Sequence, residues 1–130
     1  MQIKSFSKRH NLIYESLTYL INGICFEAHN QLGRYSREKQ YCDYIEKRFK
    51  EEGIKYNREY SIGDSGNIVD FLIDDKLILE IKAKSFITKA DYYQTQRYLQ
   101  ITGLKLALLV NFRNRYLRPK RIIRVKSKKN

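Results

Sequence analysis

The sequence is poor in several residue types, and each shortage excludes a class of protein. It has no tryptophan, one proline, one methionine and two cysteines among 130 residues. Cys25 and Cys42 are too few for a disulfide scaffold, and they lack the spacing of a metal site. One proline and six glycines leave little sequence for a long flexible linker. We therefore expect one domain with one core over residues 1–130.

Long apolar runs are also missing. No stretch approaches the roughly 18 apolar residues that a membrane span requires. The first 15 residues, MQIKSFSKRHNLIYE, lack the apolar core of a secretory signal. The overall content, 42% hydrophobic and 31% charged, is typical of a folded globular domain. We expect a cytoplasmic protein with reduced thiols and no membrane partner.

Acidic residues are absent from the last third of the chain. Up to Asp91 there are 15 Lys or Arg against 14 Asp or Glu, whereas from Tyr92 onward there are 11 Lys or Arg and no acid. Nearly all of the net charge of +12 therefore lies in that last third. A one-sided basic field attracts polyanions, and nucleic acid is the partner we expect. The alternative is a solvated basic tail that only aids solubility.

Three segments have the apolar spacing of amphipathic helices. Gly33, Gly53 and Gly103 follow them as expected stops, and Ser36 and Thr88 are the expected caps of the second and third. We expect helices over residues 14–32, 36–52 and 88–101.

Five other segments have the pattern of strands. We expect them over residues 54–62, 68–73, 76–84, 106–112 and 121–125. The short turns at residues 64–67 and at Asp74-Asp75 predict an antiparallel meander. The run LALLVNF at 106–112 fits a strand buried on both faces, reached by a right-handed crossover onto a parallel neighbour. The order ααβββαββ predicts an α/β (α+β) fold, with a mixed sheet and helices on both faces.

Charged residues interrupt the apolar hairpin made by the second and third expected strands. Because side chains alternate along a strand, we expect Val69 and Phe71 on one face and Asp70 on the other. In the next strand, Glu80 and Lys82 share one face by the same rule. A carboxylate within an apolar strand is costly unless a cation or hydrogen bonds compensate it. One divalent cation beside Asp70 and Glu80 compensates both.

These residue types suit phosphodiester hydrolysis, which needs a positive centre for the phosphate and a nucleophile at neutral pH. Mg²⁺ (or Mn²⁺) prefers oxygen ligands, so we expect it on Asp70, Glu80 and the backbone carbonyl of Ile81. Lys82 orients the attacking water, helps to deprotonate it, or stabilises the charge of the phosphorane; the sequence leaves all three open. An ordinary explanation also stays open, namely a Glu80–Lys82 surface pair and an aspartate at a strand edge.

The hairpin resembles the core of PD-(D/E)XK nucleases, with Asp70 as the aspartate and Glu80-Ile81-Lys82 as the (D/E)-x-K element. More narrowly, the chain resembles the bacterial GxxExxY family of that superfamily over about residues 17–121. The similar motifs are residues 26–33, 38–41, 70, 80–83, 94–99 and 102–105. The resemblance implies a PD-(D/E)XK nuclease-like fold and metal-dependent cleavage of nucleic acid.

The chain departs from that family at three positions. Tyr35 stands where the family has its first glycine, Asp91 where it often has a histidine, and Lys89 where it has a nearby proline. We expect these changes to alter a partner surface more than the metal site.

The resemblance also implies roles for residues on the expected helices. Glu38 matches a helix glutamate that completes or supports the metal site, although an acid at a helix start is also favoured by the macrodipole. Gln94 and Tyr98 resemble a QxxxY element that steadies the phosphate or the lysine, although both also suit packing on the sheet. For His29 we expect a partly buried hydrogen-bonding role rather than catalysis.

Arginine forks suit phosphate oxygens, and Tyr116 among them can stack on a base. The residues that we expect to bind nucleic acid are Arg97, Arg113, Arg115, Arg118, Lys120 and Arg121. The leading hypothesis is a metal-dependent nuclease acting on DNA, with RNA less favoured. The alternatives are a module on a nuclease-like fold that binds nucleic acid or protein without cleavage, and an interaction protein for an acidic partner. A domain this small often needs a second copy of itself, in a homodimer, or a partner protein to select its substrate.

Overall fold

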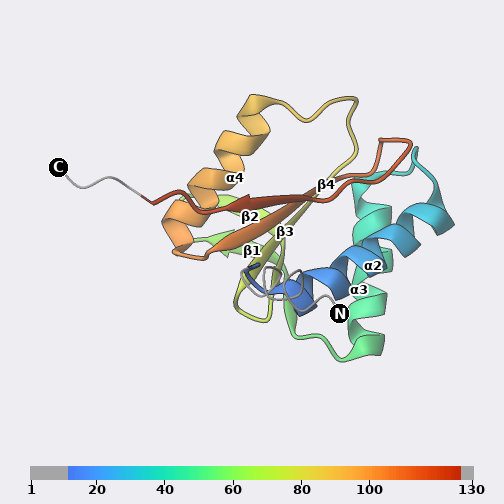
Figure 1. Cartoon of the computed structure of the whole chain (residues 1–130), viewed down its shortest axis with the longest axis horizontal. Helices are drawn as coiled ribbons and strands as arrows, with labels where there is room; N and C mark the ends of the chain where they lie inside the picture. The colour runs from blue at the N-terminus through green and yellow to red at the C-terminus, as the bar shows by residue number, and fades with distance from the viewer. Residues whose placement is uncertain (1–11, 127–130) are drawn as a thin grey trace, which may run out of the picture.

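The computed structural model describes residues 12–126; residues 1–11 and 127–130, which include the end of the basic tail, lie outside the described range (Figure 1). The order of elements within residues 12–126 is the predicted ααβββαββ. The elements are α2 (Glu15–Leu32), α3 (Glu38–Glu52), β1 (Tyr56–Ile62), β2 (Asn67–Ile73), β3 (Leu77–Lys82), α4 (Lys89–Thr102), β4 (Leu106–Asn111) and β5 (Lys120–Ile123).

The strands form one mixed sheet in the order β1-β2-β3-β4-β5. Only β3 and β4 pair in parallel, and α4 is the crossover between them, as predicted. Asp74 and Asp75 join β2 to β3, and both have positive φ angles, 53° and 56°. Two such residues in succession make the type I′ turn whose twist matches that of the flanking strands, and aspartate tolerates this conformation better than most residues.

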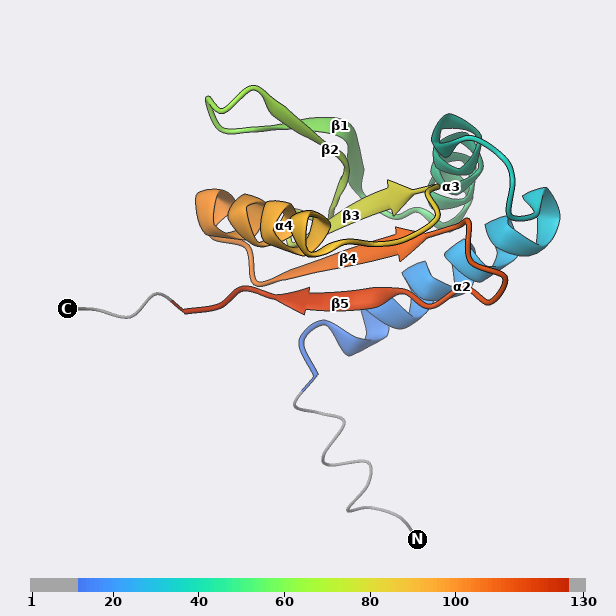
Figure 2. The ribbon, with the colours of Figure 1, turned by 90° about the horizontal axis from the view of Figure 1, so that it is seen from above.

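Helices cover both faces of the sheet, which confirms the predicted fold class. Figure 2 shows α4 on one side of the strands and α2 on the other. The core on the α2 and α3 side includes Tyr41 stacked on Phe112, with ring centroids 4.2 Å apart. The core on the α4 side includes Tyr98 and Leu99. No helix in the described part of the chain is long and apolar enough to cross a membrane.

The prediction that Ser36 caps α3 was wrong. The helix begins two residues later, and the Ser36 hydroxyl donates to the carbonyl of Leu32 at the end of α2, at 3.1 Å. The start of α3 is capped by Gln40 instead. Its side-chain oxygen accepts a hydrogen bond from the backbone N–H of Arg37 at 2.8 Å. The last carbonyls of α2 also need partners, and the serine serves that end.

The Thr88 cap of α4 is confirmed. Its hydroxyl accepts from the backbone N–H of Asp91, and the Asp91 carboxylate accepts from the backbone N–H of Thr88 at 2.7 Å. Asp91 also forms an ion pair with Lys84 at 2.8 Å. This capping box explains the acid at position 91, since it joins the start of α4 to the end of the preceding strand.

The β1–β2 hairpin bends sharply away from the rest of the sheet (Figure 2). Val69 packs in the core on the α4 side, whereas Phe71 packs in the core on the α2 and α3 side. The prediction that they share a face was therefore wrong. The cause is at Glu59 of β1, which has a left-handed φ of 57° and does not pair with the residue opposite it, Asp70. The alternation of side chains is broken at this point.

Candidate active site

Asp70 and Glu80 lie where the β2–β3 ladder ends. The two strands pair from Ile73↔Leu77 to Phe71↔Leu79 and then separate. Beyond that point the side chains replace the ladder. Glu80 Oε1 accepts from the backbone N–H of Asp70 at 2.8 Å, and Asp70 Oδ2 accepts from the backbone N–H of Ile81 at 2.7 Å. The separation of the strands thus fixes both carboxyl groups and leaves a second oxygen on each for another partner.

Burial makes this acid pair unusual. Glu80 is only 5% exposed, and Asp70 is half-buried. Desolvation, followed by the nearby charge of Asp70, raises the pKa of Glu80 to about 8. Desolvation also raises the pKa of Asp70. Glu80 therefore keeps its proton near neutral pH.

The charge of Lys82 acts on the same pair. It favours the ionised forms of Asp70 and Glu80 and so lowers the pKa of both. Among residues 12–126, Lys82 is half-buried and forms no ion pair within 4 Å of any carboxylate. The structure therefore brings the three predicted residues to one place, with the ammonium near the acids but not bonded to them.

This arrangement can hold a cation. The donor set is two carboxylates, each with one oxygen that is not fixed by the backbone, beside the end of β3. Within the described residues, no group of three or more His, Cys, Asp and Glu side chains is arranged to hold a metal. Mg²⁺ nevertheless commonly binds to only one or two carboxylates, and waters and substrate oxygens complete its coordination. The residues present therefore fit a hard divalent cation.

A family model described as the PD-(D/E)XK nuclease superfamily matches residues 15–125. The chain belongs to the PD-(D/E)XK nuclease superfamily. It matched none of the curated proteins and none of the solved structures with which it was compared. Membership indicates a nuclease-like function with a nucleic-acid substrate; the likeness to GxxExxY proteins remains a resemblance.

In this superfamily member, Glu38 shares a pocket with Asp70. Glu38, at the first position of α3, lines a pocket of about 240 Å³ together with Asp70. The same pocket includes Arg58, whose charge lowers the pKa of Asp70. Arg58 also bonds to Asp43 and Glu46 of α3, both at 2.8 Å. Sequence reasoning missed this arginine because it lies in an ordinary polar strand with no motif.

The structure separates the two residues of the QxxxY element. Tyr98 is 4% exposed, and burial, followed by the charge of Glu80, raises its pKa. Gln94, one turn earlier, is exposed and makes no hydrogen bond to the described residues. Arg97 is exposed beside them on α4. Gln94 and Arg97 are thus available to a ligand, whereas Tyr98 is part of the core on the α4 side.

Buried polar side chains hold the ends of β3 and β4. Asn111 is 3% exposed, and its amide donates to the Lys84 carbonyl at 2.8 Å and accepts from the Lys84 N–H at 3.1 Å. His29 Nε2 lies 2.9 Å from the Asn114 carbonyl, so it has the hydrogen-bonding role that we expected. Sequence reasoning missed Asn111 because it ends an apolar run without any motif.

The basic residues predicted to bind nucleic acid have different environments. Arg113, Arg115 and Arg118 line one open pocket after β4. Lys120 is exposed on the edge strand β5. Arg121 instead donates to the Thr18 hydroxyl and the Ile13 carbonyl, so part of its guanidinium serves the fold.

Proposed function

We propose that this protein is a metal-dependent nuclease that hydrolyses phosphodiester bonds, with DNA the preferred substrate. The observation that supports this most is the buried Asp70–Glu80 pair at the separation of β2 and β3, with Lys82 on the next position of the same face. A buried acid with a raised pKa lowers stability when it ionises. A cation bound between the two carboxylates would offset the cost of burying their charge.

Asp70 and Glu80 are the proposed metal ligands, together with the carbonyl of Ile81, and Glu38 supports them from α3. Mg²⁺ or Mn²⁺ bound there supplies Lewis-acid stabilisation of phosphate charge and a more acidic water. One oxygen of each carboxylate is held by a backbone N–H, Glu80 Oε1 by that of Asp70 and Asp70 Oδ2 by that of Ile81, and the other oxygen of each is proposed to bind the metal.

Lys82 is proposed to contact the scissile phosphate or the attacking water. An ammonium with no ion pair keeps its donors for a ligand, and its half-buried position strengthens the interaction by lowering the local dielectric. Tyr98 is buried in the core on the α4 side of the sheet. Gln94 and Arg97 on the exposed face of α4 are proposed to contact the phosphate backbone.

The test is cleavage by the intact protein and by matched variants. Plasmid, linear duplex and single-stranded DNA, and an RNA strand, are each incubated with Mg²⁺, Mn²⁺ or EDTA. We expect metal-dependent products whose rate falls at least about 100-fold in Asp70→Asn, Glu80→Gln and Lys82→Met. The controls are Asp64→Asn in a turn and Lys47→Met on the exposed face of α3, and both should cleave as the wild type does.

Cleavage that survives in all three variants would show that the activity comes from another site or from a contaminant. Salt-sensitive binding of DNA without any cleavage would instead favour a binding module on the nuclease fold.

A further inference from the structure

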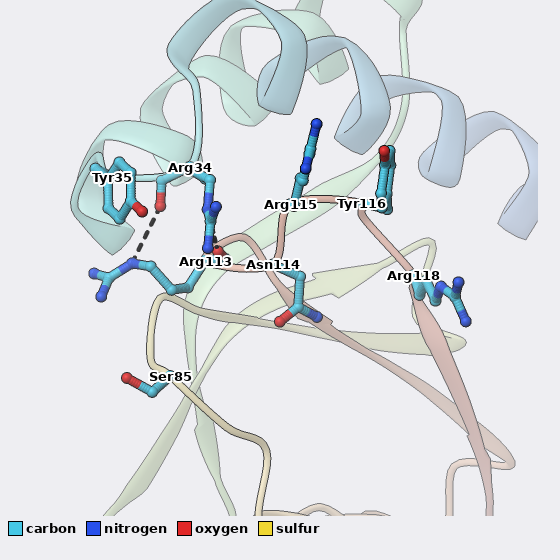
Figure 3. A pocket seen from close by; sticks show the side chains of 8 residues that line it. All are labelled: Arg34, Tyr35, Ser85, Arg113, Asn114, Arg115, Tyr116 and Arg118. Atoms are coloured by element: carbon cyan, nitrogen blue, oxygen red, sulfur yellow. Dashed lines mark hydrogen bonds between the residues drawn. The ribbon is translucent and has the colours of Figure 1, made fainter.

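A second pocket, separate from the acid pair, lies between the α2–α3 connection and the loop after β4. It has a volume of about 510 Å³, and its lining contains no acidic residue. Four of the lining residues are arginines and two are tyrosines (Figure 3). The full lining set is Arg34, Tyr35, Ser85, Arg113, Asn114, Arg115, Tyr116 and Arg118.

The two walls of the pocket are joined by reciprocal hydrogen bonds. Arg34 Nε donates to the carbonyl of Arg113 at 2.9 Å, and Arg113 Nε donates to the carbonyl of Arg34 at 3.1 Å (Figure 3). Arg113 also donates to the carbonyl of Ala83 at 3.2 Å. Leu117 is buried in the core and fixes the far end of the loop. The pocket is therefore built into the fold rather than formed by free side chains.

The positive charge in this pocket has no counter-charge. In the described part of the chain, none of its four arginines forms an ion pair, although nine such pairs occur elsewhere. Holding like charges together costs free energy unless an anion compensates them. Arg115 and Arg118 are exposed, so their donors are available to phosphate oxygens.

The tyrosines add a second kind of recognition. Tyr35 is 73% exposed and Tyr116 is 67% exposed. The guanidinium carbon of Arg34 lies 4.9 Å from the Tyr35 ring centroid, and that of Arg115 lies 5.4 Å from the Tyr116 ring centroid. Exposed rings beside cations make platforms on which bases stack. Only an unpaired base can reach such a platform, because bases within a duplex are stacked on one another.

We infer that this pocket binds an unpaired nucleotide of single-stranded nucleic acid, with arginines on the phosphates and a tyrosine ring under a base. The inference deepens the proposed nuclease function and rests on it for the link to cleavage. Ser85 follows Lys82 by three residues, and Tyr35 precedes Glu38 by three. Two of the three segments that line the pocket, the α2–α3 connection and the segment after β3, thus continue directly into the active site, and the pocket is placed to hold a strand that enters it.

Binding of labelled oligonucleotides to the intact protein in EDTA tests this inference, because no cleavage occurs there. The probes are a thymidine and a uridine oligomer of about twelve nucleotides and a duplex of the same length. Tyr35→Ala and Tyr116→Ala should each weaken binding of a single strand about tenfold and change duplex binding by less than about twofold. Tyr19→Ala, which removes an exposed tyrosine of α2 outside the pocket, is the control and should change neither.

Arg115→Gln and Arg118→Gln should each lower the slope of log affinity against log salt by about 0.7 for the single strand. Equal losses for single strand and duplex in the tyrosine variants, or losses no larger than in Tyr19→Ala, would overturn the inference. Cleavage that depends on Asp70 would survive that failure. Conversely, binding of single strands that depends on both tyrosines, without any cleavage, would support the inference about the pocket and refute the proposed nuclease function.

Discussion

The carboxylate of Glu80 accepts a hydrogen bond from the backbone N–H of Asp70, 2.8 Å away, at the point where β2 and β3 cease to pair. Asp70 in turn accepts from the residue after Glu80. The two acids therefore bridge the strands where the ladder stops, and each keeps a second oxygen outside these bonds. The groups that bridge the strands are also those that we propose as ligands of the cation.

The raised pKa of Glu80 predicts how stability changes with pH when no metal is present. With a pKa of about 8 in the folded state against 4.5 ordinarily, the folded protein holds more protons than the unfolded chain between those values. The contribution of Glu80 to the free energy of unfolding is then fully present below about pH 4.5 and is lost as the pH rises to about 8. Urea unfolding in EDTA should show a loss on the order of a few kcal/mol.

The variant Glu80→Gln isolates this contribution. It should have a flatter dependence than the wild type between about pH 5 and 8, while Glu15→Gln at the partly exposed start of α2 should keep the wild-type slope. Identical slopes for the wild type and Glu80→Gln would mean that Glu80 is ionised in the folded protein, contrary to its raised pKa.

The bend at Glu59 predicts an unusual order of stabilities. A left-handed φ of 57° favours glycine and opposes a β-branched side chain. Thermal and urea unfolding should therefore find Glu59→Gly more stable than Glu59→Val, by roughly 1–2 kcal/mol. Asn57 lies two residues before Glu59 and pairs regularly with Leu72. At this position the valine variant should be more stable than the glycine variant, because valine suits a strand. A preference for valine at both positions would contradict the bend.

Asn111 is predicted to stabilise the fold although it touches no proposed substrate. Replacement by alanine leaves the N–H and carbonyl of Lys84 without their buried partner, and the free energy of unfolding should fall by about 1–3 kcal/mol. Asn57→Ala, at an exposed strand position, is the matched control and should cost less than about 0.5 kcal/mol. Equal losses in urea unfolding would refute the role of Asn111.

Local chemistry explains why most of the fold could be predicted from the sequence. Gly33, Gly53 and Gly103 each adopt a positive φ that stops a helix, and Asp74-Asp75 form the tight turn that their residue types favour. The element order and the parallel crossover followed from these signals and from the apolar run at 106–112. Ser36 was misassigned because it satisfies the helix before it rather than the one after it.

Long-range geometry could not be predicted in the same way. The change of face between Val69 and Phe71 depends on a distortion in the neighbouring strand, at Glu59, which no pattern within β2 reports. The bonds between Arg34 and Arg113 join residues 79 positions apart, so neither segment alone indicates a pocket. The acid pair was predictable because the cost of a carboxylate in an apolar strand is visible in the sequence itself.

The most direct measurement is the binding of Mn²⁺ to the intact protein at about pH 8.5, followed by the loss of the free-ion electron paramagnetic resonance signal. The account predicts one bound ion per chain in the wild type and in Glu15→Gln. It predicts at least about tenfold weaker binding in Asp70→Asn and Glu80→Gln, and weaker binding by the wild type near pH 6, where the proton on Glu80 competes. Undiminished binding in both Asp70→Asn and Glu80→Gln would contradict the claim that these two carboxylates hold the metal.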